Sequence, residues 1–315
     1  MMSKPSLYSK VLSSILCIII GIVFIFSGIS KIPTLEQFGW TIVETTPLNW
    51  DIAEWCARLL IGLEIFLGLL FITHLRLRKL AIPLSFLLLS VFTAYLLLVI
   101  KVHGSSGNCG CFGEMIQMTP LQSVYKNVAM LLVIGIIFFL QHEWTFRFAT
   151  LAVVLLFLSC LLVPFLINPP ESIYIYEKES DINEPLPLSM LYQSEINAPP
   201  KEELRKGKHV ISFMSLTCEY CRKAAKRIRI MKNKHPELPF YLVLNGDSSM
   251  LKPFFEDTRL TNVPYSMFNG AEQFKTINGG TALPTIKWVK DTTLVRESNY
   301  ITLDENEILK WLHEK

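Results

Sequence analysis

Five long apolar stretches alternate with short polar segments over the first half of the chain. The first of them, residues 11–30, holds twenty residues without a charge. At the rise of an α-helix, such a run spans about 30 Å, the thickness of the hydrocarbon core of a bilayer. It lacks the shorter apolar core and small-residue cleavage site of a signal peptide, so we interpret it as a permanent anchor. We predict five membrane-spanning helices, which cover residues 11–30, 52–73, 80–100, 121–140 and 148–168.

The second half carries shorter apolar runs separated by turn residues, the pattern of an α/β domain. The predicted order of elements is βαβαββα, which describes a mixed sheet with helices on its faces. The strands are predicted at 210–214, 239–244, 285–289 and 293–296, and the helices from Cys218 onward, at 249–258 and at 304–312. The chain is thus expected to hold a transmembrane bundle (1–150), a fifth transmembrane helix (148–168), a linker (169–190) and an α/β domain (186–315).

Composition and charge support this organisation. Hydrophobic residues make up 51% of the chain, which is high for a soluble protein and indicates the lipid bilayer as a partner. The net charge is only +3, and no dense basic block with interleaved aromatic residues indicates nucleic acid. Lys and Arg gather in the N-terminal segment and in the second and fourth connections, at Lys4, Lys10, Arg76, Arg78, Lys79 and Arg147. The positive-inside rule then predicts a cytoplasmic N-terminus and an extracytoplasmic segment 168–315, in a bacterial inner membrane.

Two cysteines at the start of a predicted helix carry the most specific chemistry. Cys218 and Cys221 follow the buried strand 210–214 and a short turn. Such a pair closes a small disulfide or opens to a thiolate, which a helix N-terminus stabilises. The alternatives are a structural disulfide or half of a zinc site, but the domain has no second cysteine pair. We therefore predict redox exchange, in which Cys218 attacks and Cys221 resolves the intermediate.

This domain resembles the thioredoxin fold over roughly residues 186–315. The matching features are the element order, the Cys218–Cys221 motif at the first helix start, and Leu283-Pro284-Thr285 before a later strand. The resemblance implies that Pro284 is cis and lies against the cysteine pair, and that Leu283 faces the substrate peptide. Thr217 stands where many members of that family have an aromatic residue.

The membrane half resembles the MauE/DoxX family of redox-associated membrane proteins over about residues 8–150. The resemblance is carried by the sequences GIVFIFSGISK (21–31), RLLIGLEIFLG (58–68) and NCGCFG (108–113). It implies a four-helix bundle linked to disulfide formation in extracytoplasmic proteins, as in methylamine utilisation. Nothing in this chain identifies a methylamine-related substrate.

A second cysteine pair, Cys109 and Cys111, lies in a glycine-rich loop between the third and fourth predicted spans. The charge rule places this loop on the same side of the membrane as Cys218. Flanking glycines permit the tight backbone that so closely spaced a disulfide needs, and strained disulfides exchange readily. The alternatives are a structural disulfide that only stabilises the loop, or a metal site that includes His103. We predict exchange, because the spacing departs from the usual zinc pattern.

Ionisable residues inside a predicted span indicate a further polar site within the membrane bundle. Glu64 falls near the middle of the second span and Arg58 six residues earlier, on a different face. We expect Glu64 to find a partner on another helix, at Lys31 or Lys126, and favour a polar contact that stabilises the bundle over a proton relay. Among the remaining cysteines, Cys56 is a weak candidate for exchange, whereas Cys17 and Cys160 are interpreted as packing residues.

Together these features predict a membrane-bound thiol–disulfide oxidoreductase acting on extracytoplasmic thiol and disulfide proteins. Electrons would pass between the Cys218/Cys221 pair and the Cys109/Cys111 pair through mixed disulfides. Two alternatives remain open: a passive membrane tether for a substrate-binding module, and a relay that carries reductant outward. No cofactor or metal is predicted, since no nucleotide, haem or flavin motif occurs; a quinone acceptor would be compatible, but no residue pattern indicates one.

Overall fold

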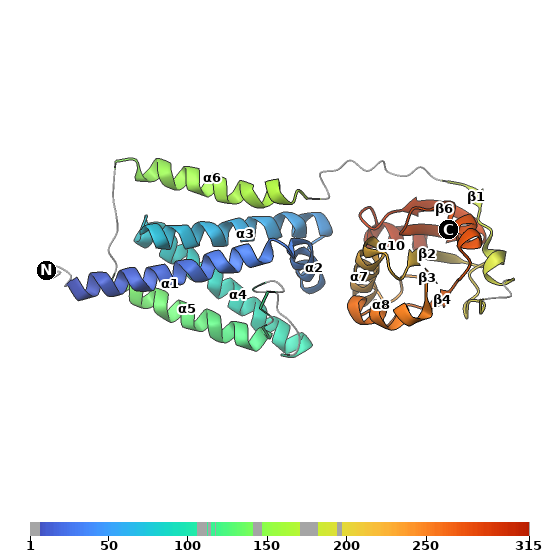
Figure 1. Cartoon of the computed structure of the whole chain (residues 1–315), viewed down its shortest axis with the longest axis horizontal. Helices are drawn as coiled ribbons and strands as arrows, with labels where there is room; N and C mark the ends of the chain where they lie inside the picture. Colours follow the sequence, from blue (N-terminus) through green and yellow to red (C-terminus); the bar gives the residue numbers. More distant parts are fainter. Residues whose placement is uncertain are drawn as a thin grey trace. The chain divides into compact units, whose positions relative to one another are not determined.

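The computed structural model describes residues 7–105, 112, 115–116, 118–140, 147–170, 182–193 and 197–314 (Figure 1). The chain divides into two compact units, residues 1–173 and 174–315. The second cysteine pair, Cys109 and Cys111, lies outside the described residues. Each unit is considered by itself below.

The first unit is built from helices. Its elements are α1 (Leu7–Lys31), α2 (Leu35–Thr45), α3 (Trp50–Thr73), the π-helical turn η1 (Leu77–Ala81), α4 (Ile82–His103), α5 (Pro120–Leu140) and α6 (Ala149–Ile167). Within the described part of the chain, five helical segments are long and apolar enough to cross a membrane, each overlapping one predicted span. The protein is therefore a multi-pass membrane protein. The short helix α2 was not predicted.

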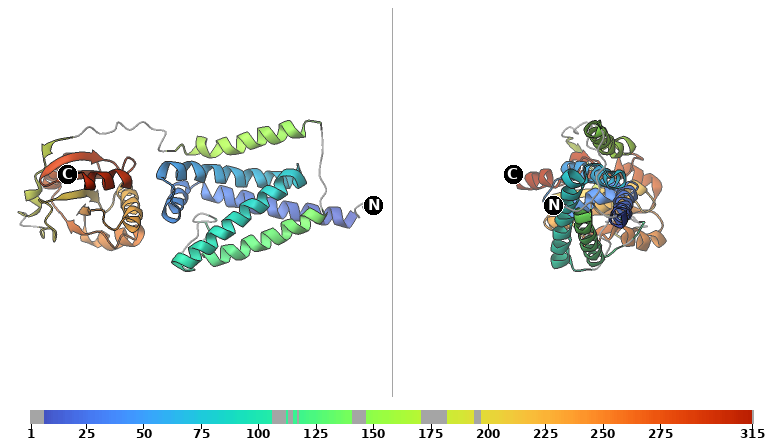
Figure 2. Two further views of the ribbon diagram at one scale, coloured as in Figure 1. Left: turned by 180° about the vertical axis from the view of Figure 1, so that it is seen from behind. Right: turned by 90° about the vertical axis from the view of Figure 1, so that its left-hand side faces the viewer.

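Glycines allow the membrane helices to approach each other closely. Helix α3 packs against α1 and α6, and α4 packs against α5, as the views from two sides show (Figure 2). A Cβ added to Gly68 of α3 would lie 2.6 Å from the backbone oxygen of Gly21 in α1. Likewise, a Cβ on Gly62 would lie 2.6 Å from the backbone oxygen of Cys160 in α6. Small residues at such crossings let two backbones pack directly, which stabilises helix pairs in a bilayer.

The second unit contains a six-stranded mixed sheet. The strands are β1 (Glu184–Pro185), β2 (Lys208–Ser215), β3 (Phe240–Asn245), β4 (Tyr265–Met267), β5 (Thr285–Lys290) and β6 (Thr293–Ser298), in the spatial order β1-β6-β5-β2-β3-β4. Strands β2, β3 and β4 are parallel, whereas β5 pairs antiparallel with β2 and β6. The helices are α7 (Glu219–Lys234), α8 (Leu251–Thr258), α9 (Ala271–Asn278) and α10 (Glu305–His313), with short 3-10 turns η3 (Leu188–Leu191) and η4 (Ser248–Met250).

The predicted order βαβαββα is incomplete, because β4 and α9 intervene between α8 and β5. The strand that leads to the cysteine pair is central and buried on both faces. On one face, Ile211 and Phe213 pack against Phe274 and Ile277 of α9. On the other face of the sheet, Val210 of β2 lies opposite Trp288 of β5, and the Trp288 ring is 5.4 Å from the Trp311 ring of α10. A strand fixed on both faces holds the loop at its end in a defined position.

Candidate active site

The end of β2 and the start of α7 position the two cysteines of the second unit. Strand β2 ends at Ser215, and Cys218 is the N-cap residue of α7 with extended backbone angles. Its sulfur takes the place of the usual capping oxygen, since the Cys221 backbone N–H donates to Cys218 Sγ at 3.2 Å. This N–H is one of the groups that a helix start leaves without an intrahelical partner. The contact stabilises negative charge on the Cys218 sulfur.

The two cysteines differ in exposure, although both are free thiols. Cys218 is half-buried, whereas Cys221 is fully buried and receives the Ser215 backbone N–H on its sulfur at 3.4 Å. Burial raises the pKa of the Cys221 thiol above its usual range, and its hydrogen bond with Cys218 raises the pKa further. Cys218 is therefore the more accessible of the two thiols, as the predicted attacking cysteine has to be, whereas Cys221 is enclosed.

The loop before β5 forms the other wall of the site. The Leu283–Pro284 peptide bond is cis, as the thioredoxin resemblance implied. The carbonyl oxygen of Leu283 accepts from Cys218 Sγ at 3.9 Å, so this loop touches the cysteine pair. Asn278, at the end of α9, holds the loop by donating from Nδ2 to the Gly280 and Ala282 carbonyls, each at 3.0 Å. The positioning contribution of Asn278 was not predicted, since nothing in its local sequence marks it.

Arg222 binds the turn between β2 and α7 and also helix α8. Its guanidinium donates to the Leu216 carbonyl at 3.1 Å and to Asp257 of α8 at 3.3 Å. Lys226 also binds Asp257, at 2.8 Å, and the buried Arg227 donates to the Leu303 carbonyl at 2.9 Å. These three basic residues of α7 are therefore tied to neighbouring segments of the domain.

An aromatic pair borders the cysteine motif. Tyr220, between the two cysteines, is 55% exposed, and its ring centroid lies 6.1 Å from that of the buried Tyr300. The Lys223 ammonium lies 5.5 Å from the Tyr220 ring. Tyr220 therefore presents an exposed ring between the two cysteines.

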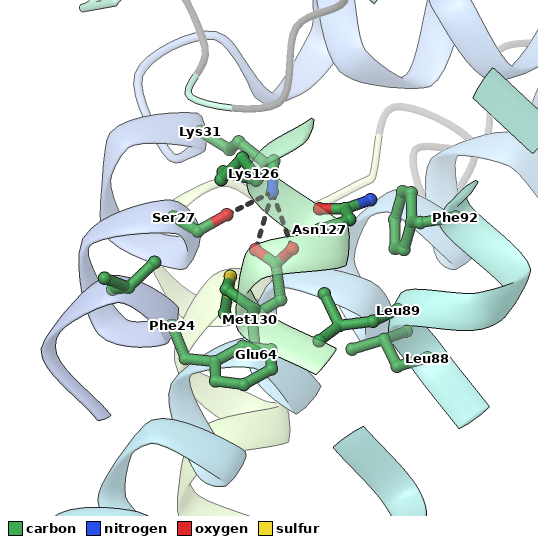
Figure 3. Close-up of a pocket in the computed structure, with 11 residues that line it drawn as sticks. Phe24, Ser27, Lys31, Glu64, Leu88, Leu89, Phe92, Lys126, Asn127 and Met130 are labelled. Carbon is green, nitrogen blue, oxygen red and sulfur yellow. Dashed lines mark hydrogen bonds and ion pairs between the residues drawn. The ribbon is translucent and has the colours of Figure 1, made fainter. Parts of the chain in front are cut away.

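The first unit contains a separate buried polar cluster (Figure 3). Lys31 Nζ at the end of α1 contacts both carboxylate oxygens of Glu64 in α3, at 2.7 and 2.6 Å, and donates to Ser27 Oγ at 2.9 Å. The prediction that Glu64 pairs with a residue of another helix is confirmed, and Lys31 is that residue. Lys126 and Asn127 of α5 line the same small cavity, whose volume is ≈ 20 Å³.

The other singled-out residues of the first unit lie apart from this cluster. Arg58 is buried and donates to the Asn168 carbonyl at 2.8 Å and the Glu54 carbonyl at 2.9 Å, so it joins α3 to the end of α6. Cys17 and Cys160 are buried in the apolar core, in agreement with the packing interpretation, and Cys56 is half-buried. Among the residues that the structure describes, no group of three or more His, Cys, Asp and Glu side chains could hold a metal ion.

The mixed sheet, the dithiol at the start of α7 and the cis proline beside it define a thioredoxin-fold domain, which this chain carries on a bundle of membrane helices. Residues 9–141 match the family model of the methylamine utilisation protein MauE, which confirms the resemblance predicted for the membrane half. The chain is also 27% identical to protein TlpB of Flavobacterium psychrophilum over 332 residues, covering 90% of each chain.

Two solved structures are similar to the second unit. One is the thioredoxin domain of a thiol-disulfide oxidoreductase from Bacteroides vulgatus, with 15% identity and a TM-score of 0.30, covering 35% of this chain and 81% of that one. The other is StoA from Bacillus subtilis, with 18% identity and a TM-score of 0.26, covering 35% of this chain and 84% of that one.

Proposed function

We propose that this protein is a membrane-bound thiol–disulfide oxidoreductase whose Cys218 exchanges disulfides with extracytoplasmic proteins and is reset by Cys109 and Cys111. The observation that carries the proposal is the asymmetric dithiol of the second unit. A half-buried sulfur receives an N–H at the helix start, and a buried thiol lies beneath it. This division of exposure is what an attacking and a resolving cysteine require.

The substrate side of the reaction involves the Leu283–Pro284 loop. The Leu283 carbonyl lies within 3.9 Å of Cys218 Sγ, so an extended peptide bound beside Leu283 brings its own cysteine to that sulfur. The Cys218 thiolate attacks the substrate disulfide and releases one substrate sulfur as a thiolate. Cys221 then attacks Cys218, which releases the second substrate sulfur and leaves a Cys218–Cys221 disulfide. The reverse sequence oxidises a substrate dithiol.

The proposed orientation follows from the loop charges. The short connection around Arg76, Arg78 and Lys79 and the residue Arg147 are assigned to the cytoplasm of a bacterial inner membrane. Residues 168–315 are then extracytoplasmic, as is the loop with Cys109 and Cys111. Both cysteine pairs share one compartment in this arrangement, which direct exchange between them requires.

Trapping of the mixed disulfide tests the intramolecular step. In a chain with Cys221→Ser, Cys109→Ser and Cys56→Ser, mass spectrometry after mild oxidation should find a disulfide between Cys218 and Cys111. Adding Cys218→Ser gives the matched control, in which that species must vanish. Absence of the Cys218–Cys111 disulfide in the first variant would rule out the proposed transfer.

The redox state of Cys218 and Cys221 in cells separates the proposal from its two alternatives. A passive tether predicts no change in that state when Cys109 and Cys111 are both replaced by serine. An outward relay of reductant predicts a pair held reduced in the native chain and oxidised in that variant. An oxidising pathway predicts the opposite shift, and maleimide gel-shift assays after acid quenching distinguish the three outcomes.

A further inference from the structure

A group of positive side chains lies at one end of the membrane bundle. Its members come from the first turn of α1, from η1 and the residue before it, and from the turn before α6; they are Lys10, Arg76, Arg78, Lys79 and Arg147. Figure 1 shows the end of α3, the end of α5 and the start of α6 at the end of the bundle where the N-terminus lies. These five residues are called the basic cluster below.

The positive charge of the basic cluster exceeds the negative charge near it. Among the residues that the structure describes, the acidic ones of the first unit lie in α2 or in the first two thirds of α3; they are Glu36, Glu44, Asp51, Glu54 and Glu64. Helix α2 and the start of α3 are at the opposite end of the bundle (Figure 1). Near the cluster the sequence adds one acidic residue, Glu143, against five positive side chains. The excess positive charge favours binding of an anion from outside the protein.

Arg76 joins the basic cluster to helix α6. Its Nη2 donates to Thr150 Oγ1, in the first turn of α6, at 2.8 Å. This bond fixes the guanidinium but uses one of the five N–H donors that the group carries. Arg147 lies three positions before Thr150, so the Cα atoms of these two residues are at most about 11 Å apart. Arg76 and Arg147 are therefore close enough to bind one phosphate group together, and guanidinium–phosphate bonds are among the strong hydrogen bonds of proteins.

Apolar rings lie directly beside the arginines. The Arg78 guanidinium is 5.5 Å from the Phe138 ring of α5, and the Arg147 guanidinium is 5.6 Å from the Phe148 ring, which is 61% exposed. At the end of a membrane helix, a long basic side chain extends to the level of the head groups, and apolar groups next to it contact the acyl chains. A soluble anion would use only the charges of this surface, whereas a phospholipid uses both the charges and the rings.

Helix α6 continues the apolar surface away from the basic cluster. It packs mainly against α3, and most of its residues face away from the bundle. Leu151 and Leu155 lie one turn apart on the same face of α6, and each is 56% exposed. This face begins one position after Thr150, the residue that accepts from Arg76. A charged site and an exposed apolar strip are thus adjacent, as the two parts of a phospholipid require.

We infer that the basic cluster binds the phosphate head group of an anionic glycerophospholipid, with an acyl chain along the exposed face of α6. Arg76 and Arg147 donate to the phosphate oxygens, and the other members of the cluster attract the anionic head group at longer range. The bound lipid adds a contact to α6, a helix that the bundle holds mainly through α3. The inference depends neither on the proposed redox function nor on the orientation of the chain, because it rests on the charge and the exposed surface of the bundle.

Lipid titration of the purified full-length chain in detergent tests the site, with the melting temperature as the readout. Dioleoylphosphatidylglycerol should raise the melting temperature at lower concentrations than dioleoylphosphatidylcholine, because a ligand that binds the folded state stabilises it. The double variant Arg76→Gln with Arg147→Gln should need about tenfold or more phosphatidylglycerol for the same rise, since charge-assisted hydrogen bonds to the phosphate are lost.

Two further variants accompany this measurement. Lys101→Gln with Lys201→Gln removes the same charge outside the basic cluster, so it is the matched control and should respond to phosphatidylglycerol as the native chain does. Arg147→Gln alone leaves the Arg76–Thr150 bond in place. It should lower the sensitivity to phosphatidylglycerol by a smaller factor than the double variant, even if the double variant is less stable without lipid.

Three results would overturn the inference. Equal stabilisation of the native chain by the two lipids would show that the head-group charge is not recognised. An unchanged response to phosphatidylglycerol in both arginine variants would show that the lipid binds elsewhere. Inorganic phosphate that suppresses the effect of phosphatidylglycerol more strongly than sodium chloride of equal ionic strength would identify a site for a soluble anion instead of a lipid.

Discussion

At the scale of single residues, the difference between the two cysteines of the α7 motif is decisive. Cys218 is half-buried and its sulfur receives an N–H, while Cys221 is enclosed by its own domain. Two thiols three positions apart thus have distinct chemistry, because only one of them is removed from water. Enclosure disfavours the charged thiolate of Cys221.

This difference predicts a pH-dependent pattern of alkylation. Burial raises the pKa of Cys221, so its thiol stays protonated through neutral pH and becomes a thiolate only as the pH rises into the alkaline range. Iodoacetamide at pH 7 should therefore modify Cys218 and spare Cys221, as measured by peptide mass spectrometry of the reduced protein. Equal modification of both cysteines in the folded protein at pH 7 would contradict the assignment of roles.

A second residue-scale prediction concerns the intramembrane ion pair. Replacing Glu64 by Leu leaves the Lys31 ammonium buried without its carboxylate partner, although it still donates to the Ser27 hydroxyl. Removing one partner of a buried ion pair costs about 3–5 kcal/mol. The double variant Lys31→Leu with Glu64→Leu should lose less stability than either single variant, since neither charge remains. The stability of the three variants is measured by thermal unfolding in detergent, in which size-exclusion chromatography follows the loss of folded protein. Additive losses would show that the two groups do not act as a pair.

At the scale of elements, close helix contacts organise the first unit. Gly21 and Gly68 let the α1 and α3 backbones touch, with no room for a side chain. Both glycines fall within the stretches that carry the family resemblance, GIVFIFSGISK and RLLIGLEIFLG. The same crossing brings Lys31 and Glu64 together further along the two helices. Packing of α1 on α3 is therefore a condition for the polar cluster.

Substitution of Gly68 tests that condition. Gly68→Val places new atoms within the 2.6 Å approach to the Gly21 oxygen, and we expect a loss of about 1–3 kcal/mol or more, as for an overpacked core. Gly135→Ala in α5 is the matched control, because a Cβ there meets nothing within 4 Å. The apparent melting temperature in detergent should fall for Gly68→Val and stay near the native value for Gly135→Ala. The reverse ranking would refute the close α1–α3 contact.

The elements also show what sequence patterns can and cannot reveal. The membrane spans were predicted because uncharged runs of about twenty residues have few alternatives to a bilayer helix. Helix α2 was missed because its 11 residues mix polar and apolar positions, and β4 was missed because it has only three residues after Pro264. At the site, the motif residues Cys218, Cys221 and Pro284 were predicted. The hydrogen bond between Arg222 and Asp257 joins residues 35 positions apart, so a local pattern carries no sign of it. Those of Asn278 depend on how the chain turns at Gly280 and Ala282, which the residue types alone do not specify.

At the scale of the whole molecule, the arrangement of charges around the membrane determines which chemistry is available. Disulfides persist outside the cytoplasm and are rare within it. A dithiol domain on the outer side can therefore exchange with secreted proteins, whereas the same domain in the cytoplasm would meet mainly reduced thiols. The predicted sidedness of residues 168–315 is thus part of the proposed mechanism, and it agrees with the odd number of spans, five, among the described residues.

Accessibility of introduced cysteines measures this sidedness. In a chain whose native cysteines are replaced by serine, Asn233→Cys on the exposed surface of α7 should react with a membrane-impermeant maleimide in intact cells. Lys79→Cys, exposed in the connection before α4, should react only after the cells are permeabilised. The prediction follows from the cluster of Arg76, Arg78 and Lys79, because positive residues in short connections remain on the cytoplasmic side. Labelling of the Lys79 position in intact cells, with protection of the Asn233 position, would invert the topology and remove Cys218 from its proposed substrates.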